Sequence, residues 1–183
     1  MQLVYTFLAE GFEEVEALTV VDLLKRASID TKMVSISDRY EVTGSHGITV
    51  KADLLFEETD MEAATLLFLP GGVPGTPNLA AHEGLKNAIT AFHCQEKRLA
   101  AICAAPSIFG EMGILDGRKA TCYPGYEKVL RGALCEGDGV VTDGHITTGK
   151  GMGTAIAFGL ELITQLKGKD ISDDIAEKIQ YNQ

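Results

Sequence analysis

Short apolar runs alternate with amphipathic stretches from one end of the chain to the other. The runs are rich in β-branched and aromatic residues and have strand length, whereas the stretches between them place apolar residues three and four positions apart, as amphipathic helices do. This pattern predicts strands at 3–9, 31–37, 65–69, 99–103 and 119–123, and helices at 13–27, 83–94, 106–112 and 154–166, with a last helix capped by Ser172 and running through Ile179.

Two further segments have the pattern of hairpins. One covers 40–51 around the turn Gly44-Ser45-His46-Gly47, and the other covers 139–148 and turns at Asp143-Gly144. Strands that alternate with helices predict an α/β sandwich with a mostly parallel central sheet. Because the pattern is unbroken by linkers or repeats, we expect one domain over residues 1–183.

Charge and hydropathy narrow the possible partners. The net charge of −10 disfavours nucleic acid, because such a surface repels phosphate. The apolar runs are too short to span a bilayer, and the first residues read as a strand rather than a signal peptide. We therefore expect a cytoplasmic protein with no membrane or nucleic-acid partner.

The cysteines and histidines lack the spacing of metal ligands. The four cysteines form no C-x-x-C motif, and the four histidines form no H-x-x-x-H pair. We expect all four cysteines to be reduced, and neither a metal nor another cofactor is predicted.

Cys103 lies at the point where a predicted strand becomes a helix. Residues 99–102 are wholly apolar, as in a strand covered on both faces, and Pro106 suits the first turn of a helix. The carboxyl ends of parallel strands are where open α/β sheets bind ligands, and a helix N-terminus favours a thiolate. The position predicts a reactive thiol with a pKa below about 8.5, with a small buried side chain as the alternative.

Two segments after other strands could serve the same edge of the sheet. Glu13 and Glu14 suit the first turn of a helix, whereas Glu16 could point along the edge and, if desolvated, donate a proton to a thiolate. Gly71 and Gly72 end a strand and could turn backbone N–H groups toward a ligand, or simply form a tight turn.

These residues together resemble the DJ-1 branch of the ThiJ/PfpI superfamily over nearly the whole chain. The resemblance rests on five segments, each modest alone: 8–16, 44–47, 69–72, 100–106 and 151–154. It implies a flavodoxin-like three-layer sandwich, a cysteine nucleophile elbow and a homodimer.

The resemblance also assigns roles at the site. Cys103 matches the reactive cysteine, Glu16 the protonated glutamate beside it, and the N–H groups of Gly72 and Ala104 an oxyanion-type site. The residues that it places around a substrate are Glu13, Gly71, Tyr123, Lys150 and Met152. Tyr123 is a departure, because the best-known member has a histidine there, and a phenol does not shuttle protons at neutral pH.

The function implied is cofactor-independent chemistry on a small electrophilic carbonyl substrate. The leading hypothesis is a glyoxalase that converts a 2-oxoaldehyde to a 2-hydroxy acid, or a deglycase-type activity, in the response to oxidative and carbonyl stress. The alternative is a redox sensor or chaperone that acts through oxidation of Cys103. Peptidase or amidase activity is disfavoured, because Ala104 stands where such relatives have a histidine.

Overall fold

A seven-stranded sheet forms the centre of the protein. The computed structural model describes residues 2–135 and 137–181. The strand order is β10-β11-β7-β6-β1-β2-β5, and every pair is parallel except β10 with β11. The strands are β1 (Leu3–Leu8), β2 (Asp30–Ser35), β5 (Leu54–Leu55), β6 (Leu66–Leu69), β7 (Arg98–Ile102), β10 (Val140–Asp143) and β11 (Ile146–Gly149). The mostly parallel sheet is as predicted.

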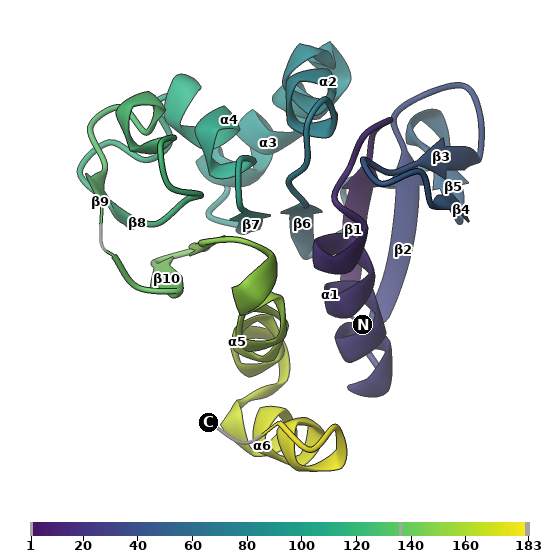
Figure 1. The fold of residues 1–183 in the computed structure, drawn as a ribbon, viewed down its shortest axis with the longest axis vertical. Coiled ribbons are helices and arrows are strands. Elements are labelled where there is room, and N and C mark those ends of the chain that lie inside the picture. The colour runs from purple at the N-terminus through teal and green to yellow at the C-terminus, as the bar shows by residue number, and fades with distance from the viewer. Residues whose placement is uncertain (1, 136, 182–183) are drawn as a thin grey trace.

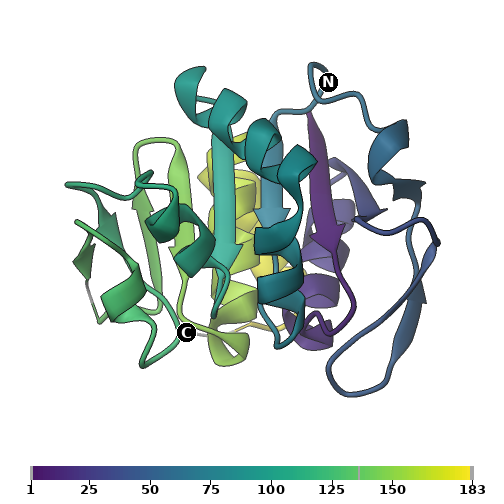
Figure 2. The same cartoon turned by 90° about the horizontal axis from the view of Figure 1, so that it is seen from above.

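Helices cover both faces of this sheet and make the sandwich three layers deep. One face carries α1 (Glu14–Arg26), α5 (Ala155–Lys167) and α6 (Lys169–Lys178); the other carries α2 (Gly75–Ala81), α3 (Glu83–Cys94) and α4 (Pro106–Glu111). Figure 1 shows the first group below the central strands and the second above them. Figure 2 shows α3 in front of the sheet and α5 behind it. No helix of the described residues has both the length and the hydropathy to cross a membrane.

Successive side chains along the central strands point to opposite faces of the sheet, and this produces two hydrophobic cores. In β6, Leu67 and Leu69 face the layer of α3 and α4, whereas Leu66 and Phe68 face the layer of α1 and α5. The residues of β7 divide between the two cores in the same way. Both strands are apolar at every buried position because neither face reaches water.

Two small sheets flank the main one. The predicted hairpin at 40–51 is confirmed as β3 (Glu41–Thr43) paired antiparallel with β4 (Thr49–Lys51). The second small sheet pairs β8 (Lys119–Ala120) with β9 (Leu134–Cys135). The strand predicted at 119–123 is therefore shorter than expected. Its last residue leaves the small sheet, because the N–H of Tyr123 donates to the carbonyl of Cys103 (2.8 Å).

The predicted capping role of Ser172 is wrong. The last helix begins earlier, at Lys169, directly after Gly168 with a φ of +92°. Ser172 is buried inside α6, where its hydroxyl donates to the carbonyl of Leu160 at 2.8 Å. The serine therefore ties α6 to α5 instead of starting a helix. The sequence pattern did not indicate helix α2, strands β5 and β9, or the short 3-10 helices at Phe56–Glu58 and Glu127–Val129.

Candidate active site

Cys103 occupies a strained turn directly after β7. Its φ of +64° lies in the left-handed region, which side chains rarely adopt. The turn is fixed from both sides: the N–H of Cys103 donates to the carbonyl of Gly149 (2.9 Å), and its own carbonyl accepts from Tyr123. The cysteine is half-buried. A sharp turn between strand and helix, as predicted for this position, therefore presents the sulfur at the carboxyl edge of the sheet.

Glu16 comes to the same edge from α1. It lies one turn before Val20 on the buried side of the helix and is completely inaccessible to solvent. Oε2 accepts a hydrogen bond of 2.9 Å from the N–H of Gly71, and the side chain hydrogen-bonds with Cys103. Its other oxygen, Oε1, is buried without a partner in the part of the chain that the structure describes. The predicted juxtaposition of carboxyl and thiol is thus present.

The two glycines after β6 bring the backbone close to this pair. A Cβ on Gly71 would lie 2.7 Å from Oε2 of Glu16 and 3.1 Å from Sγ of Cys103. Gly72 has a φ of +100°, and a Cβ there would lie 2.4 Å from the backbone nitrogen of Glu13. The N–H groups of Gly72 and Ala104 hydrogen-bond to the sulfur and favour its anion. The close approach depends on the absence of side chains at positions 71 and 72.

Burial and mutual repulsion set the electrostatics of the pair. Desolvation by burial is the main cause that raises the pKa of Glu16 to about 7, although hydrogen bonds to Cys103 and Gly71 oppose the change. Desolvation, followed by the charge of Glu16, raises the pKa of Cys103 to about 12. Two groups coupled this strongly titrate as a unit. The pair therefore loses its first proton near pH 7 and resists losing the second.

The predicted lowering of the thiol pKa is wrong. Helix α4 begins only at Pro106 and has six residues, so its N-terminus offers little compensation to the sulfur. Burial and the carboxylate of Glu16 outweigh the N–H groups of Gly72 and Ala104. A thiolate at neutral pH thus requires Glu16 to hold the proton, so that one negative charge is shared between the two side chains.

The other predicted residues surround the pair at different depths. Glu13 is buried, and its Oε2 accepts from the N–H of Glu16 at 2.6 Å. The backbone of Met152 is one of the groups that oppose the raised pKa of Glu16, while the side chain of Met152 is exposed. Tyr123 is half-exposed, and a Cβ on Gly151 would lie 3.3 Å from its ring. These contacts place Glu13, Tyr123 and Met152 around the site.

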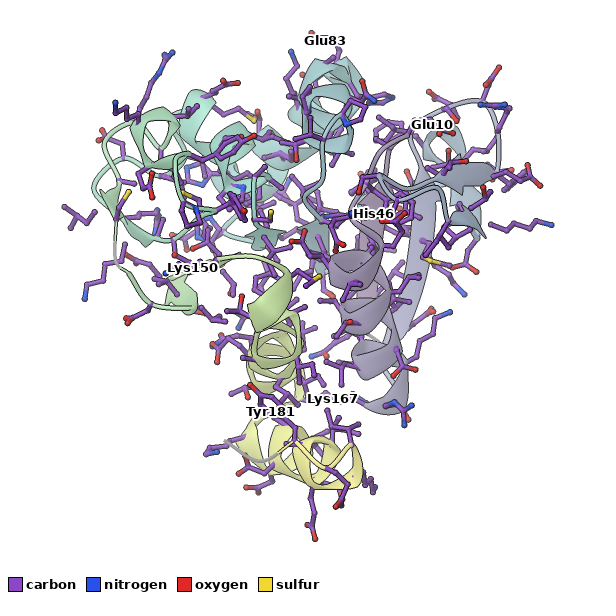
Figure 3. All side chains as sticks on the ribbon, in the orientation of Figure 1. Glu10, His46, Glu83, Lys150, Lys167 and Tyr181 are labelled. Carbon is purple, nitrogen blue, oxygen red and sulfur yellow. The ribbon has the colours of Figure 1, made fainter. Side chains whose placement is uncertain are left out.

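Lys150 differs from the other predicted residues. Its Nζ donates to the carbonyl of Gly137 at 3.3 Å, and its backbone N–H donates to Gly139. The side chain therefore holds the loop before β10 instead of pointing at the thiol. Figure 3 shows it on the segment that leads into α5, well apart from His46 beside α1.

Sequence reasoning missed the partner of Glu14. This carboxylate is buried and accepts from the N–H groups of His46 (2.8 Å) and Ile48 (3.3 Å) and from Nδ1 of His46 (3.0 Å). Although desolvation opposes it, the hydrogen bond from His46 and three backbone hydrogen bonds lower the pKa of Glu14 to about 2. The glycines of the turn were the available signal, because a Cβ on Gly44 would lie 2.3 Å from Glu14.

Within the described residues, Glu13, Glu14 and His46 form the one group of three close enough to share a metal ion. The hydrogen bonds already made to both oxygens of Glu14 occupy the positions that a cation would need. The donor set fits a hydrogen-bonded clamp between α1 and the hairpin better than a metal centre.

Comparison with known proteins agrees with this geometry. The family model described as the DJ-1/PfpI family matches residues 2–165. The chain belongs to the DJ-1/PfpI family. Over 170 residues it is 35% identical to DJ-1 homolog B of Arabidopsis thaliana, an alignment that covers 92% of this chain and 39% of the plant protein. The chain thus spans about two fifths of the length of that relative.

Two further family members align with this chain over nearly the whole of their own length. A deglycase of Pyrococcus abyssi is 31% identical over 161 residues, which are 87% of this chain and 96% of the archaeal protein. The solved structure of oxidized DJ-1 from Toxoplasma gondii superposes with a TM-score of 0.96 at 31% identity and covers 100% of both chains. The fold of this DJ-1/PfpI chain is therefore shared from end to end.

Proposed function

We propose that this DJ-1/PfpI protein is a cofactor-independent enzyme that converts a small 2-oxoaldehyde to a 2-hydroxy acid. The observation that carries the proposal is the contact between Cys103, on its strained turn, and the buried carboxyl of Glu16. This pair provides a nucleophile and a proton carrier, and the proton carrier Glu16 changes protonation state near neutral pH.

In the proposed reaction, Cys103 forms a bond to the substrate that is later broken, and Glu16 first gives a proton and then takes one up. The thiolate of Cys103 attacks the aldehyde carbon and forms a hemithioacetal, whose oxygen receives the proton held by Glu16. The resulting carboxylate then moves a proton from the former aldehyde carbon to the adjacent carbonyl carbon, while the hydroxyl proton of the hemithioacetal passes to the oxygen of that carbonyl, and together the two transfers give the thioester of a 2-hydroxy acid. Water cleaves the thioester and restores the thiol. The N–H groups of Gly72 and Ala104 would stabilise the developing oxyanion.

Relatives support the class of activity. The Pyrococcus abyssi protein is named a deglycase, and removal of a carbonyl adduct from an amine would also begin with attack by a cysteine. We therefore include a deglycase-type reaction of the same thiol in the proposal. Its substrates would be small, because Cys103 is only half-exposed.

The test is lactate production from methylglyoxal without added cofactor. We expect turnover by the wild type, none by Cys103→Ala and a loss of at least about tenfold in Glu16→Gln. Circular dichroism checks that both variants are folded. Turnover retained by folded Cys103→Ala would exclude the mechanism.

A redox sensor is the second candidate, and a separate observation favours it. The hydrogen bonds from Gly72, Ala104 and Glu16 to the sulfur would also stabilise an oxidised cysteine, and the solved Toxoplasma gondii relative is described as oxidized. Intact mass after mild peroxide treatment separates the candidates. A gain of two oxygen atoms at Cys103 with negligible lactate production would favour the sensor, and no gain would count against it.

We further propose that the protein works as a homodimer in the cytoplasm. Four exposed apolar side chains come from α1, the β3–β4 hairpin and the start of α5: Val15, Ile48, Met152 and Ile156. The N–H of Ile48 donates to Oε1 of Glu14, the residue before Val15, and α1 packs on α5, which carries Ile156. An exposed apolar patch of this kind is typical of an interface.

A further inference from the structure

The turn of the β3–β4 hairpin is firmly docked on the N-terminal end of α1. The N–H of Ser45 donates to the carbonyl of Phe12 (2.8 Å), and the N–H of His46 donates to Oε1 of Glu14. Gly44 approaches Glu14 so closely that no side chain fits between them. These contacts fix the position of the His46 backbone relative to the helix.

The imidazole of His46 faces two carboxylates. Nδ1 lies 3.0 Å from Oε2 of Glu14 and 4.0 Å from Oε1 of Glu13, while 71% of the side chain is exposed. Among the residues that the structure describes, these two acids are the charged groups that face the ring. The hydrogen bond to Glu14 raises the pKa of His46, so the ring holds its proton to a higher pH than a free histidine. Figure 3 shows His46 beside the first turn of α1.

Glu13 connects this cluster to the reactive pair. Its Oε2 accepts from the N–H of Glu16 at 2.6 Å, and its own N–H donates to the carbonyl of Gly71 at 2.9 Å. The negative charge of Glu13 is one of the causes that raise the pKa of Glu16. When His46 is protonated, its positive charge, 4.0 Å from Oε1 of Glu13, opposes that effect.

We propose that His46 is a positioning residue for the Glu16–Cys103 pair, because its imidazolium offsets the charge of Glu13 and so lowers the pH at which the pair loses its first proton. While His46 is protonated, its positive charge weakens the repulsion between Glu13 and the negative charge on the Glu16–Cys103 pair. When the imidazole loses its proton, the repulsion by Glu13 returns and ionisation of the pair becomes harder. The inference rests on the reactive pair of the proposed function, but it does not require turnover of a 2-oxoaldehyde.

Site-specific alkylation of Cys103 provides the measurement. The rate of reaction with iodoacetamide is followed by mass spectrometry of the Cys103 peptide from pH 5 to 9, which separates it from the exposed Cys94 and Cys135. The variants are His46→Gln, which keeps a polar side chain without charge, and His46→Arg, which keeps a permanent charge. Lys169→Gln removes an exposed cation that pairs with Asp173 on α6 and is the matched control.

We expect His46→Gln to move the midpoint of the alkylation profile to higher pH and to slow the reaction at pH 6.5 about two- to threefold. His46→Arg should keep the wild-type midpoint or lower it, and Lys169→Gln should leave the profile unchanged. The effect of His46→Gln should shrink in 0.5 M sodium chloride, because salt screens charge but does not repair a packing defect.

Two results would overturn the inference. One is a His46→Gln profile that superimposes on the wild type at low salt. The other is a shift of the Gln and Arg variants in the same direction, since that would mark a structural role of the ring. Loss of the predicted lactate production with an intact His46-dependent shift would reject the proposed function and leave this inference standing.

Discussion

The N–H of Gly71 donates a hydrogen bond of 2.9 Å to Oε2 of Glu16, and the same glycine leaves no space for a side chain beside Cys103. One backbone position therefore both holds the carboxyl and allows the thiol to reach it. Space is the constraint here, because the φ of Gly71 lies outside the left-handed region.

Gly71→Ala should disrupt the pair. The new Cβ would lie 2.6 Å from Cβ of Cys103 and 2.7 Å from Oε2 of Glu16, so the two side chains must separate. We expect a destabilisation of about 1–3 kcal/mol, measured by urea unfolding, and slower alkylation of Cys103 at pH 7. Gly153→Ala is the control, because a Cβ there meets nothing within 4 Å. Equal behaviour of the two variants would contradict the close approach.

Glu16→Gln should remove the ionisation near neutral pH. The wild-type rate of Cys103 alkylation should rise through pH 7, where the pair loses its first proton. In the variant, burial still opposes ionisation of the thiol, but no carboxyl titrates beside it, so the rate should show no midpoint near pH 7 and should keep rising toward pH 9. A variant that still titrates near pH 7 would show that the two groups are not coupled.

Glu14 should stabilise the fold in a pH-dependent way. Hydrogen bonds hold its pKa at about 2 in the folded protein, below the ordinary value of 4.5 that it regains on unfolding. This contribution, about 3 kcal/mol, is present above pH 4.5 and is lost as the pH falls toward 2. Urea unfolding of the wild type and Glu14→Gln should therefore differ most above pH 5 and converge toward pH 2. A constant difference would assign the effect to packing.

Val15→Glu tests the proposed dimer. Val15 is 48% exposed on the first turn of α1 and is one of the exposed apolar side chains that we assign to the dimer interface. A carboxylate buried there on association would lack a partner, so the variant should be monomeric by light scattering while the wild type is dimeric. Asp22→Ala, on an exposed position of the same helix, should keep the wild-type mass.

Local sequence patterns were sufficient to predict most of the strands and helices of the fold. The apolar runs at β6 and β7 predicted buried parallel strands because both faces of such strands must be covered, and they are. The glycine turn at 44–47 predicted its hairpin because few other residues allow the required backbone. The prediction that Ser172 caps the last helix was wrong. A serine in this sequence context is typical of a helix N-cap, but here its hydroxyl donates to a carbonyl of another helix.

In the candidate site, too, some features follow from local sequence and others from tertiary packing. The sequence by itself determined that Cys103 ends a buried strand and that glycines follow the neighbouring strand, since both follow from local pattern and backbone sterics. Only the tertiary structure decided that burial raises the pKa of both the thiol and Glu16, and that His46 reaches Glu13 and Glu14. Desolvation and charge proximity depend on which segments meet in space, and α1, the hairpin and the loop after β6 are brought together by the packing of the sheet layers.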